Sequence, residues 1–291
     1  MLGGSGYIGR HLVRRLGSDR SVATFNATKT GGGHRFDALT MTLQDIAIDL
    51  DSITDCVILL GNVNPDWCVK NRARSAALNV TAIHKIIDQL IELGIKPLFA
   101  STEVVFDGKK GRYREEDPVN PILVYGEQKL KVEGYLRERC DDFIIARIAK
   151  VYGTSRGDGT ILTGWAESLA DGLSALRAAT DYISSPIHVD DTVAFLAGLV
   201  ENQCRGVYHL AGPEPLSRYG MAEILIEQMR AAGMSKEIAL TRCSIDDFET
   251  VEGRPHDVSM IADKVQAATG LAPLTVNQAC RSLVGDLRMT Q

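Results

Sequence analysis

Short apolar runs alternate with amphipathic helical segments along the first half of the chain. This alternation limits the possible folds more than any other feature. Residues 55–61, DCVILLG, form an almost continuous apolar run of the kind found in strands covered on both faces. Residues 77–94 carry their isoleucine and leucine side chains on one helical face and stop at Gly94. We therefore predict an α/β fold, with a doubly wound parallel (Rossmann) sheet that binds ligands at the carboxyl ends of its strands.

The remaining elements follow the same rhythm until about residue 154, where it loosens. Further strands are expected within residues 21–28, 96–102, 142–153 and 206–212, and further helices within 7–17, 124–139, 184–200, 219–233 and 262–270. From this change of pattern we expect two parts. A dinucleotide-binding domain is expected to comprise residues 1–153 and 185–213, and a smaller, mainly C-terminal substrate-binding lobe residues 154–184 and 214–291.

Composition and charge exclude several classes of protein. The net charge of −5 is spread along the chain without a basic block, so we expect no nucleic-acid partner. The six cysteines are scattered singly, which favours reduced thiols and a cytoplasmic location. The apolar stretches are too short to span a bilayer, so no membrane association is expected. The histidines lack ligand spacing, so we also expect no metal.

The first ten residues contain three glycines, Gly3, Gly6 and Gly9, directly before an amphipathic helix. In a dinucleotide-binding loop the first glycine permits a tight turn, the second lets the backbone approach a pyrophosphate, and the third lets the helix pack on the sheet. The helix N-terminus then offers free N–H groups to the phosphates. We expect Tyr7 and Ile8 to lie at the cofactor as well.

Only Met1 and Leu2 precede this loop, where the fold needs a central strand paired on both sides. We therefore expect a truncated first strand, with two sheet edges left open or joined by a substitute strand. Each buried backbone group without a partner would cost about 1–3 kcal/mol. Either the recorded start lies downstream of the true one, or the product is a degenerate copy. The chain keeps Thr102, Tyr125 and Lys129, a set of side chains suited to proton transfer to a carbonyl, and this favours the first explanation.

The second expected strand ends in FNATK, without the carboxylate that would receive the ribose hydroxyls of NAD. Asn26 and Lys29 stand there instead, which favours NADP as the cofactor, with NAD possible.

Tyr125 and Lys129 are four residues apart on a predicted helix, so their side chains share a face. A phenol has a pKa of about 10, and a neighbouring ammonium lowers it, which tunes the phenol for proton transfer to a carbonyl. Ser101 and Thr102 follow the preceding strand, where a hydroxyl can orient the same carbonyl. The alternative, a surface pair on a helix, is less attractive at this place in the fold.

These stretches together resemble the extended short-chain dehydrogenases/reductases, most of all the dTDP-4-dehydrorhamnose reductase type. The matching stretches run in family order over nearly the whole chain: GGSGYIG, FASTEVVFDG, YREEDPVNPILVYGEQKL, SPIHVDDTVAFL, GVYHLAG and GRPHDVSMIADKV. The block from VFDG to YG is fairly specific, whereas the whole superfamily shares the glycine loop.

The resemblance implies a role for each matching residue. Thr102 would bind the substrate carbonyl, Tyr125 would donate a proton, and Lys129 would hold the nicotinamide ribose and poise Tyr125. Other matching positions imply contacts with the cofactor: Asp37 and Ala38 at adenine, Gly61 and Asn62 along the cofactor backbone, and Asn79 in the geometry of the site. Glu103 and Arg254 match substrate positions, and Arg254 resembles an arginine that grips a nucleotide-sugar phosphate, although a surface salt bridge is nearly as good an explanation.

The chain departs from the family at several positions. Glu127 and Gln128 fill the middle of the Tyr-Lys motif, and we expect them to be peripheral. Glu103-Val104 replaces the common Asp-Tyr and argues against the Asp-Glu chemistry of the 4,6-dehydratases. His188 and Asp190 are expected to fix a turn and a helix cap.

The resemblance thus implies an NAD(P)H-dependent reductase of a 4-keto nucleotide-sugar, with a possible homodimer. Two alternatives stay open. One is a non-catalytic, NADP-binding regulatory subunit resembling the methionine adenosyltransferase β subunit, and the other is a nucleotide-sugar epimerase.

Overall fold

The computed structural model describes residues 1–28, 32–234 and 237–289. Its core is a parallel sheet in the order β10-β5-β4-β3, as the alternating pattern predicted. The four strands are β3 (Asp55–Ile58), β4 (Lys96–Thr102), β5 (Ile144–Ile148) and β10 (Gly206–Leu210). All three pairings are parallel, so their carboxyl ends lie at one edge. The predicted doubly wound fold is confirmed.

The place of the expected first strand is taken by Met1 and Leu2. Leu2 forms an isolated parallel bridge with Ile58: its N–H donates to Val57 O at 2.9 Å, and its carbonyl accepts from Leu59 N at 2.9 Å. On the other side the N–H of Thr24 donates to Met1 O at 3.1 Å. The first strand is thus reduced to a bridge, as expected. At Met1 and Leu2, however, the chain pairs with β3 on one side and with Thr24 on the other.

This bridge connects the main sheet to two short strands, β1 (Thr24–Phe25) and β2 (His34–Arg35), which pair in parallel. Beside the bridge lies a cavity of about 200 Å³ with a mostly apolar lining. Its lining residues include Met1, Leu16, Val22, Ile53 and Val200.

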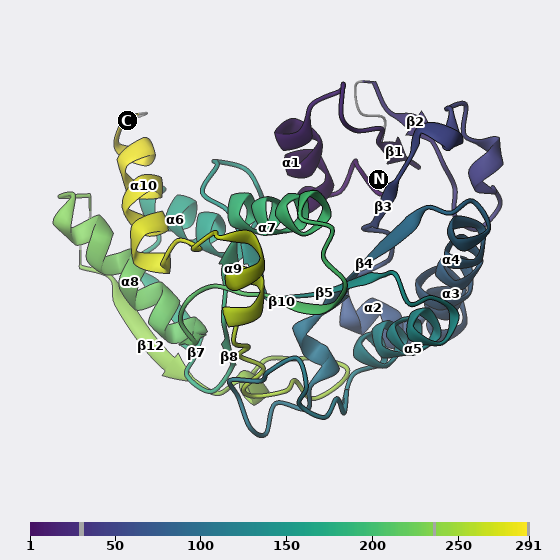
Figure 1. The fold of residues 1–291 in the computed structure, drawn as a ribbon. Helices are drawn as coiled ribbons and strands as arrows, with labels where there is room; N and C mark the ends of the chain where they lie inside the picture. Colours follow the sequence, from purple (N-terminus) through teal and green to yellow (C-terminus); the bar gives the residue numbers. More distant parts are fainter. Residues whose placement is uncertain (29–31, 235–236, 290–291) are drawn as a thin grey trace.

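Helices cover both faces of the sheet (Figure 1). α1 (Tyr7–Leu16), α7 (Val189–Glu201) and α9 (Asp263–Thr269) pack together on one face. α4 (Ala82–Glu92) and α5 (Val124–Arg139) cover the other face and contact β4. Ile83, Ile86, Ile87 and Leu90 of α4 are buried, which confirms the predicted apolar face.

Two expected elements are interrupted. The helix predicted over residues 77–94 begins with a π-helical turn, Ala77–Thr81, and continues as α4; α2 (Pro65–Lys70) and α3 (Arg72–Ala76) precede it. The strand predicted over 142–153 breaks after β5, and its end, β6 (Val151–Tyr152), pairs with β9 (Ile187–His188) outside the main sheet.

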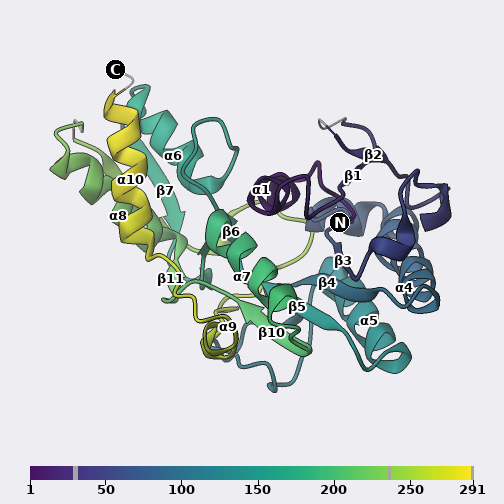
Figure 2. The same ribbon diagram turned by 45° about the horizontal axis from the view of Figure 1, so that its top comes forward.

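A second apolar cluster lies away from the sheet, around α6 (Ile161–Ala170), α8 (Arg218–Ala231) and α10 (Val276–Met289) (Figure 2). β7 (Ala175–Ala179) and β12 (Ala239–Cys243) pair beside them, and β8 (Ile183–Ser184) pairs with β11 (Leu216–Ser217). The 3₁₀ turns are Leu43–Asp45, Leu50–Ser52, Glu103–Val105 and Ile245–Asp247. The division into two domains at the predicted boundaries stays a prediction. No helix among the described residues is long and apolar enough to cross a membrane.

Close packing at the glycine loop gives a stability test. A β-carbon at Gly9 would overlap the carbonyl oxygen of Gly3 and backbone atoms of Gly4, none of which can rotate away. We expect Gly9→Ala to lower the free energy of unfolding by about 1–3 kcal/mol. Gly134→Ala in α5 is the matched control, since its β-carbon would meet nothing within 4 Å. The control should gain about 0.5–1 kcal/mol. Urea unfolding measures both, and equal effects of the two substitutions would contradict the packing argument.

Candidate active site

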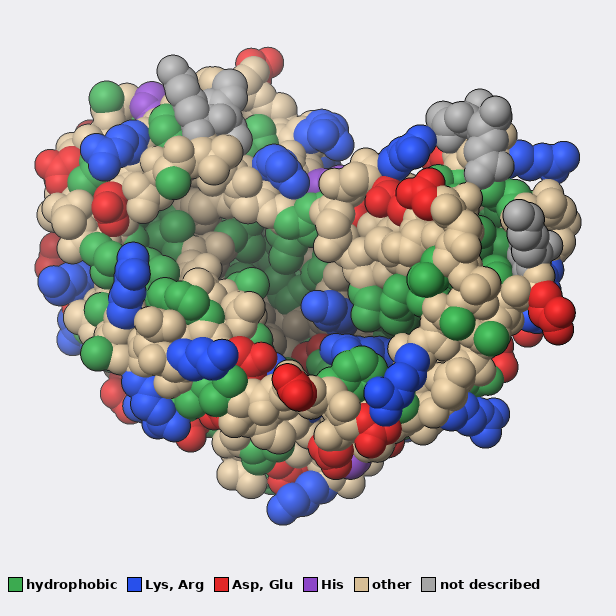
Figure 3. All heavy atoms as spheres, turned by 180° about the vertical axis from the view of Figure 1, so that it is seen from behind, with side chains coloured by type: hydrophobic (Ala, Val, Ile, Leu, Met, Phe, Trp, Pro, Cys, Tyr) green, Lys and Arg blue, Asp and Glu red, His purple; other side chains and the backbone are tan. Residues whose placement is uncertain are grey.

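A cavity of about 540 Å³ opens at the carboxyl ends of β3, β4 and β5, beside the N-terminus of α1. The face seen in Figure 3 is hollowed between the two halves of the molecule, and hydrophobic side chains line the hollow. Eleven of the predicted site residues line the cavity: Gly3, Gly6, Tyr7, Ile8, Gly9, Gly61, Thr102, Glu103, Tyr125, Lys129 and Arg254. Residues from distant parts of the sequence thus meet in one site.

Several other predicted site residues do not line the cavity. Asn26 is exposed after β1, and Asp37 and Ala38 are half-buried after β2, outside the lining of the cavity. Lys29 lies outside the described residues. Their predicted contacts with the adenosine end of a cofactor therefore stay predictions.

The glycine loop leaves the first turn of α1 open to an anion. Gly3 adopts a φ of 90°, which favours glycine, and Gly6 is the N-cap without a side chain to fill the cap. The first turn contains no acidic residue. Tyr7 reaches across from the loop and donates a hydrogen bond to Asp158 at 3.1 Å. The backbone N–H groups of the turn and the helix dipole are suited to phosphate.

Asn79 supports the neighbouring strand end rather than lining the cavity itself. Its Oδ1 accepts from the N–H of Asn62 at 2.8 Å, and its Nδ2 donates to the carbonyl of Asn62 at 3.0 Å and to Gln128 Oε1 at 2.8 Å. A β-carbon at Gly61 would meet Asn79 Oδ1 at 2.9 Å, so Gly61 has to be glycine there. The expectation that Gln128 is peripheral is wrong, since it is buried and hydrogen-bonded to both Asn79 and Ser75.

Tyr125 and Lys129 lie on the buried face of α5, below the cavity. Burial raises the pKa of the Tyr125 phenol, and a hydrogen bond from Thr102 opposes the rise only in part. The ammonium of Lys129 lies 5.9 Å from the centre of the Tyr125 ring. The expected lowering of the Tyr125 pKa is therefore wrong for the protein alone, because desolvation by burial is the largest influence on this pKa and raises it. The phenol holds its proton, as a proton donor must.

Lys129 is held in place from below by the backbone of β4. Its Nζ donates to the carbonyl of Ala100 at 2.7 Å and lies 4.6 Å from the centre of the Phe99 ring. Burial lowers the pKa of Lys129 to about 8, and the nearby carboxylate of Glu133 opposes this shift. The ammonium form is thus favoured at neutral pH, but by less than in an exposed lysine.

Glu103 is the third ionisable group at the cavity and is only 4% exposed. Burial raises its pKa to about 8, against the opposing charges of Lys150 and Arg218 and a hydrogen bond from the backbone of Lys150. Its Oε2 has no hydrogen-bond partner among the described residues. The side chain is therefore a protonated acid at neutral pH.

Three cations border this end of the cavity: Arg254, Arg218 and Lys150. Arg254 forms an ion pair with Asp66 at 2.8 Å and also lines the cavity. The salt bridge and the position at the site, which were alternatives in the sequence, are thus both present. Arg218 stacks on Tyr182, with its guanidinium carbon 4.6 Å from the ring centre. No local pattern in the sequence indicated Arg218 or Lys150, because each comes from a segment whose approach to the site depends on tertiary packing.

The remaining predicted residue types have structural roles. His188 is the N-cap of α7 and accepts from the N–H of Asp190 at 3.2 Å, which confirms the predicted cap. All six cysteines are free. Within residues 1–28, 32–234 and 237–289, no group of three or more His, Cys, Asp or Glu side chains is placed to hold a metal ion.

The parallel sheet, the open glycine loop and the Tyr-Lys pair in one cavity together define a protein of the extended short-chain dehydrogenase/reductase class. Within this class the chain belongs to the RmlD substrate binding domain family, whose model matches residues 1–289.

Individual relatives agree with this assignment. The chain is 24% identical to a dTDP-4-dehydrorhamnose reductase of Aggregatibacter actinomycetemcomitans over 292 residues, 97% of this chain and 96% of the relative. It superposes with a TM-score of 0.77 on the crystal structure of a dTDP-4-dehydrorhamnose reductase from Bacillus anthracis in complex with NADP, at 17% identity and coverage of 100% and 98%. It is also 28% identical to bovine methionine adenosyltransferase 2 subunit beta, over 54% of this chain and 49% of that one.

The raised pKa of Glu103 predicts a pH-dependent stability. Between pH about 4.5 and 8 the folded protein keeps a proton on Glu103 that the unfolded chain has lost. Stability from this group is therefore complete below the unfolded pKa and falls as the pH rises, by at most about 1.4 kcal/mol per unit. We expect Glu103→Gln to melt higher than wild type at pH 8, but not at pH 4.5.

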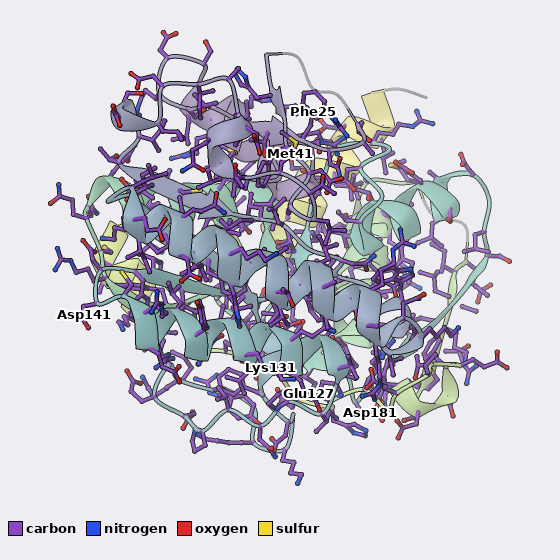
Figure 4. All side chains as sticks on the ribbon, turned by 90° about the vertical axis from the view of Figure 1, so that its right-hand side faces the viewer. Phe25, Met41, Glu127, Lys131, Asp141 and Asp181 are labelled. Carbon is purple, nitrogen blue, oxygen red and sulfur yellow. The ribbon has the colours of Figure 1, made fainter. Side chains whose placement is uncertain are left out.

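Thermal melts at the two pH values measure this difference. Glu127→Gln is the control, because Glu127 is exposed on the outer side of α5 (Figure 4). A shift of the same size at both pH values would show that Glu103 does not carry the titration.

Proposed function

We propose that the protein is an NADP(H)-dependent reductase of a 4-keto nucleotide-sugar, with NAD as a possible substitute cofactor. The observation that carries the proposal is the convergence of Thr102, Tyr125 and Lys129 on one cavity with the glycine loop. Membership of the RmlD family and the relatives named as dTDP-4-dehydrorhamnose reductases support the choice of substrate class.

The residues at the cavity fit a nicotinamide dinucleotide. The N-terminus of α1, with Gly6 as an open N-cap, suits the pyrophosphate. Lys129 would hold a ribose hydroxyl while it keeps its bond to Ala100. When bound, the reduced nicotinamide supplies a hydride to the carbonyl carbon of the substrate.

The chain's own groups handle the proton and the developing charge. Tyr125 donates its phenolic proton to the carbonyl oxygen as negative charge develops there. Thr102, which is hydrogen-bonded to the Tyr125 phenol, orients the same oxygen. The ammonium of Lys129 stabilises the phenolate that remains. The low-dielectric surroundings that raise the Tyr125 pKa also strengthen these interactions.

The border of the cavity suits a sugar linked to a diphosphate. Arg254, Arg218 and Lys150 offer positive charge for phosphate oxygens, and guanidinium groups bind such oxygens in a bidentate manner. Glu103, which is among the lining residues of the cavity and protonated at neutral pH, would hydrogen-bond a sugar hydroxyl. A cytoplasmic location, a homodimer and the two-domain division are predictions that accompany this proposal.

The central test compares Tyr125→Phe with Tyr135→Phe, a control on the same helix whose hydroxyl donates to Asp88 at the surface. With a 4-keto nucleotide-sugar, Tyr125→Phe should lower kcat about 10²- to 10⁴-fold, because it removes the proton donor. Tyr135→Phe should stay near wild type. Oxidation of NADPH at 340 nm measures both rates.

Two results would overturn the proposal. Binding of NADPH without turnover of any 4-keto nucleotide-sugar would indicate a regulatory subunit. Conversion of the sugar without net consumption of cofactor would indicate an epimerase.

Cofactor preference has its own test. A ligand at 100 times its Kd adds about 2.7 kcal/mol to the folded state, which raises the melting temperature by several degrees. We expect NADPH to give the larger rise at equal concentration and NADH the smaller one. A larger rise with NADH would contradict the prediction drawn from the end of β1, and no rise with either would contradict dinucleotide binding.

A further inference from the structure

A buried ion pair lies directly behind the candidate active site. The guanidinium of Arg147 donates to the carboxylate of Glu133 through Nη2 at 2.8 Å and through Nε at 3.1 and 3.3 Å. Both residues are only 1% exposed. Arg147 Nη1 also donates to the carbonyl of Glu115 at 3.3 Å. The pair is thus fully removed from water in the centre of the fold.

The pair is tied to the strand that carries Thr102. Ser101 donates its hydroxyl proton to Glu133 Oε1 at 2.5 Å. Ser101 and Arg147 are register partners across β4 and β5, so their side chains reach the same carboxylate from adjacent strands. Glu133 therefore fixes the end of β4 between two residues used by the site, Ala100 and Thr102.

The pair is also tied to Lys129. Tyr125, Lys129 and Glu133 follow one another at intervals of four residues along the buried face of α5. The carboxylate of Glu133 favours the ammonium form of Lys129 against burial. Cys68 also affects the Lys129 pKa and acts in the same direction.

The other charged and titratable groups around the pair do not replace Glu133 as the carboxylate that favours the ammonium form of Lys129. Arg137, one turn further along α5, lies 3.7 Å from Glu133 Oε2 but is half exposed and therefore screened by water. His209 on β10 is the register partner of Arg147, and burial together with the Arg147 charge lowers its pKa to about 3. His209 is therefore neutral in the working range. Burial raises the pKa of Glu115. The carboxyl group of Glu115 accepts a hydrogen bond from the backbone N–H of His209 at 3.0 Å.

Stability alone does not explain the pair, because removing two charges from water costs as much as their attraction returns. We propose that Glu133 is a positioning residue of the active site: held by Ser101 and Arg147, it fixes the end of β4, which carries Thr102 and the Ala100 carbonyl that the Lys129 ammonium binds. This role rests on the proposed function, since it acts through residues assigned there. It requires no contact between Glu133 and substrate.

The first measurement does not depend on turnover. The ¹⁵N shift of the Lys129 Nζ is followed against pH in lysine-labelled protein, with the signal assigned by Lys129→Arg. In Glu133→Gln the opposing carboxylate is lost and the Arg147 charge is uncompensated, so both effects favour the neutral amine. We expect the midpoint to fall by at least one pH unit, while Glu127→Gln keeps the wild-type midpoint. An unchanged midpoint in folded Glu133→Gln would overturn the proposal.

The second measurement is kinetic and uses a milder variant. Ser101→Ala removes one hydrogen bond to Glu133 and leaves both charges in place. We expect kcat to fall about tenfold, a part of what general acid catalysis supplies, with little change in KM for NADPH. A wild-type kcat in Ser101→Ala would overturn the proposal. This test remains decisive even where Glu133→Gln fails to fold. Should wild type turn over no keto-sugar, the reductase assignment fails, and the lysine titration still decides the role of Glu133.

Discussion

The Glu133–Arg147 ion pair constrains its surroundings more than any other interaction in the fold. A buried charge has to be matched on every side, and three strands and one helix contribute to the match. β4 supplies Ser101, β5 supplies Arg147, and β10 supplies a histidine that stays neutral next to the guanidinium. A shift of one residue in the register of these strands would leave a charge without a partner. The pair therefore specifies the alignment of the sheet at the level of the active site.

Burial governs the ionisation of the site itself. Tyr125, Lys129 and Glu103 come from different elements, yet burial is the largest influence on each and favours the neutral form in every case. A ligand that brings phosphate charges or excludes more water acts on all three together. Proton positions in this cavity are thus set by the environment as much as by neighbouring side chains.

Much of the fold and part of the site could be predicted from the sequence, because local patterns carry them. Periodicity indicated the sheet and its helices, and spacing indicated the glycine loop and the Tyr125–Lys129 pair. The direction of the Tyr125 pKa was predicted wrongly, since spacing shows a neighbouring charge but not the depth of burial. Gln128 looked peripheral for the same reason. Arg218 reaches the cavity from α8, which lies far away in sequence, so no local pattern pointed to it.

The π-helical turn at Ala77–Thr81 has a consequence for the helix that contains it. Each residue of an α-helix turns the chain by 100°, so a turn that holds one residue more than α-geometry changes the rotational phase of everything before it. α4 can then direct Ile83 and Ile87 at the sheet while α3 directs Ser75 at Gln128. The continuous helical segment formed by α3, the π-helical turn and α4 thus has two faces with different orientations, one toward the core and one toward the active site. Deleting a single residue from the π-helical turn would restore regular α-helix. The residues before the turn would then be rotated relative to α4, so that Ser75 would no longer face Gln128 while Ile83 and Ile87 face the sheet.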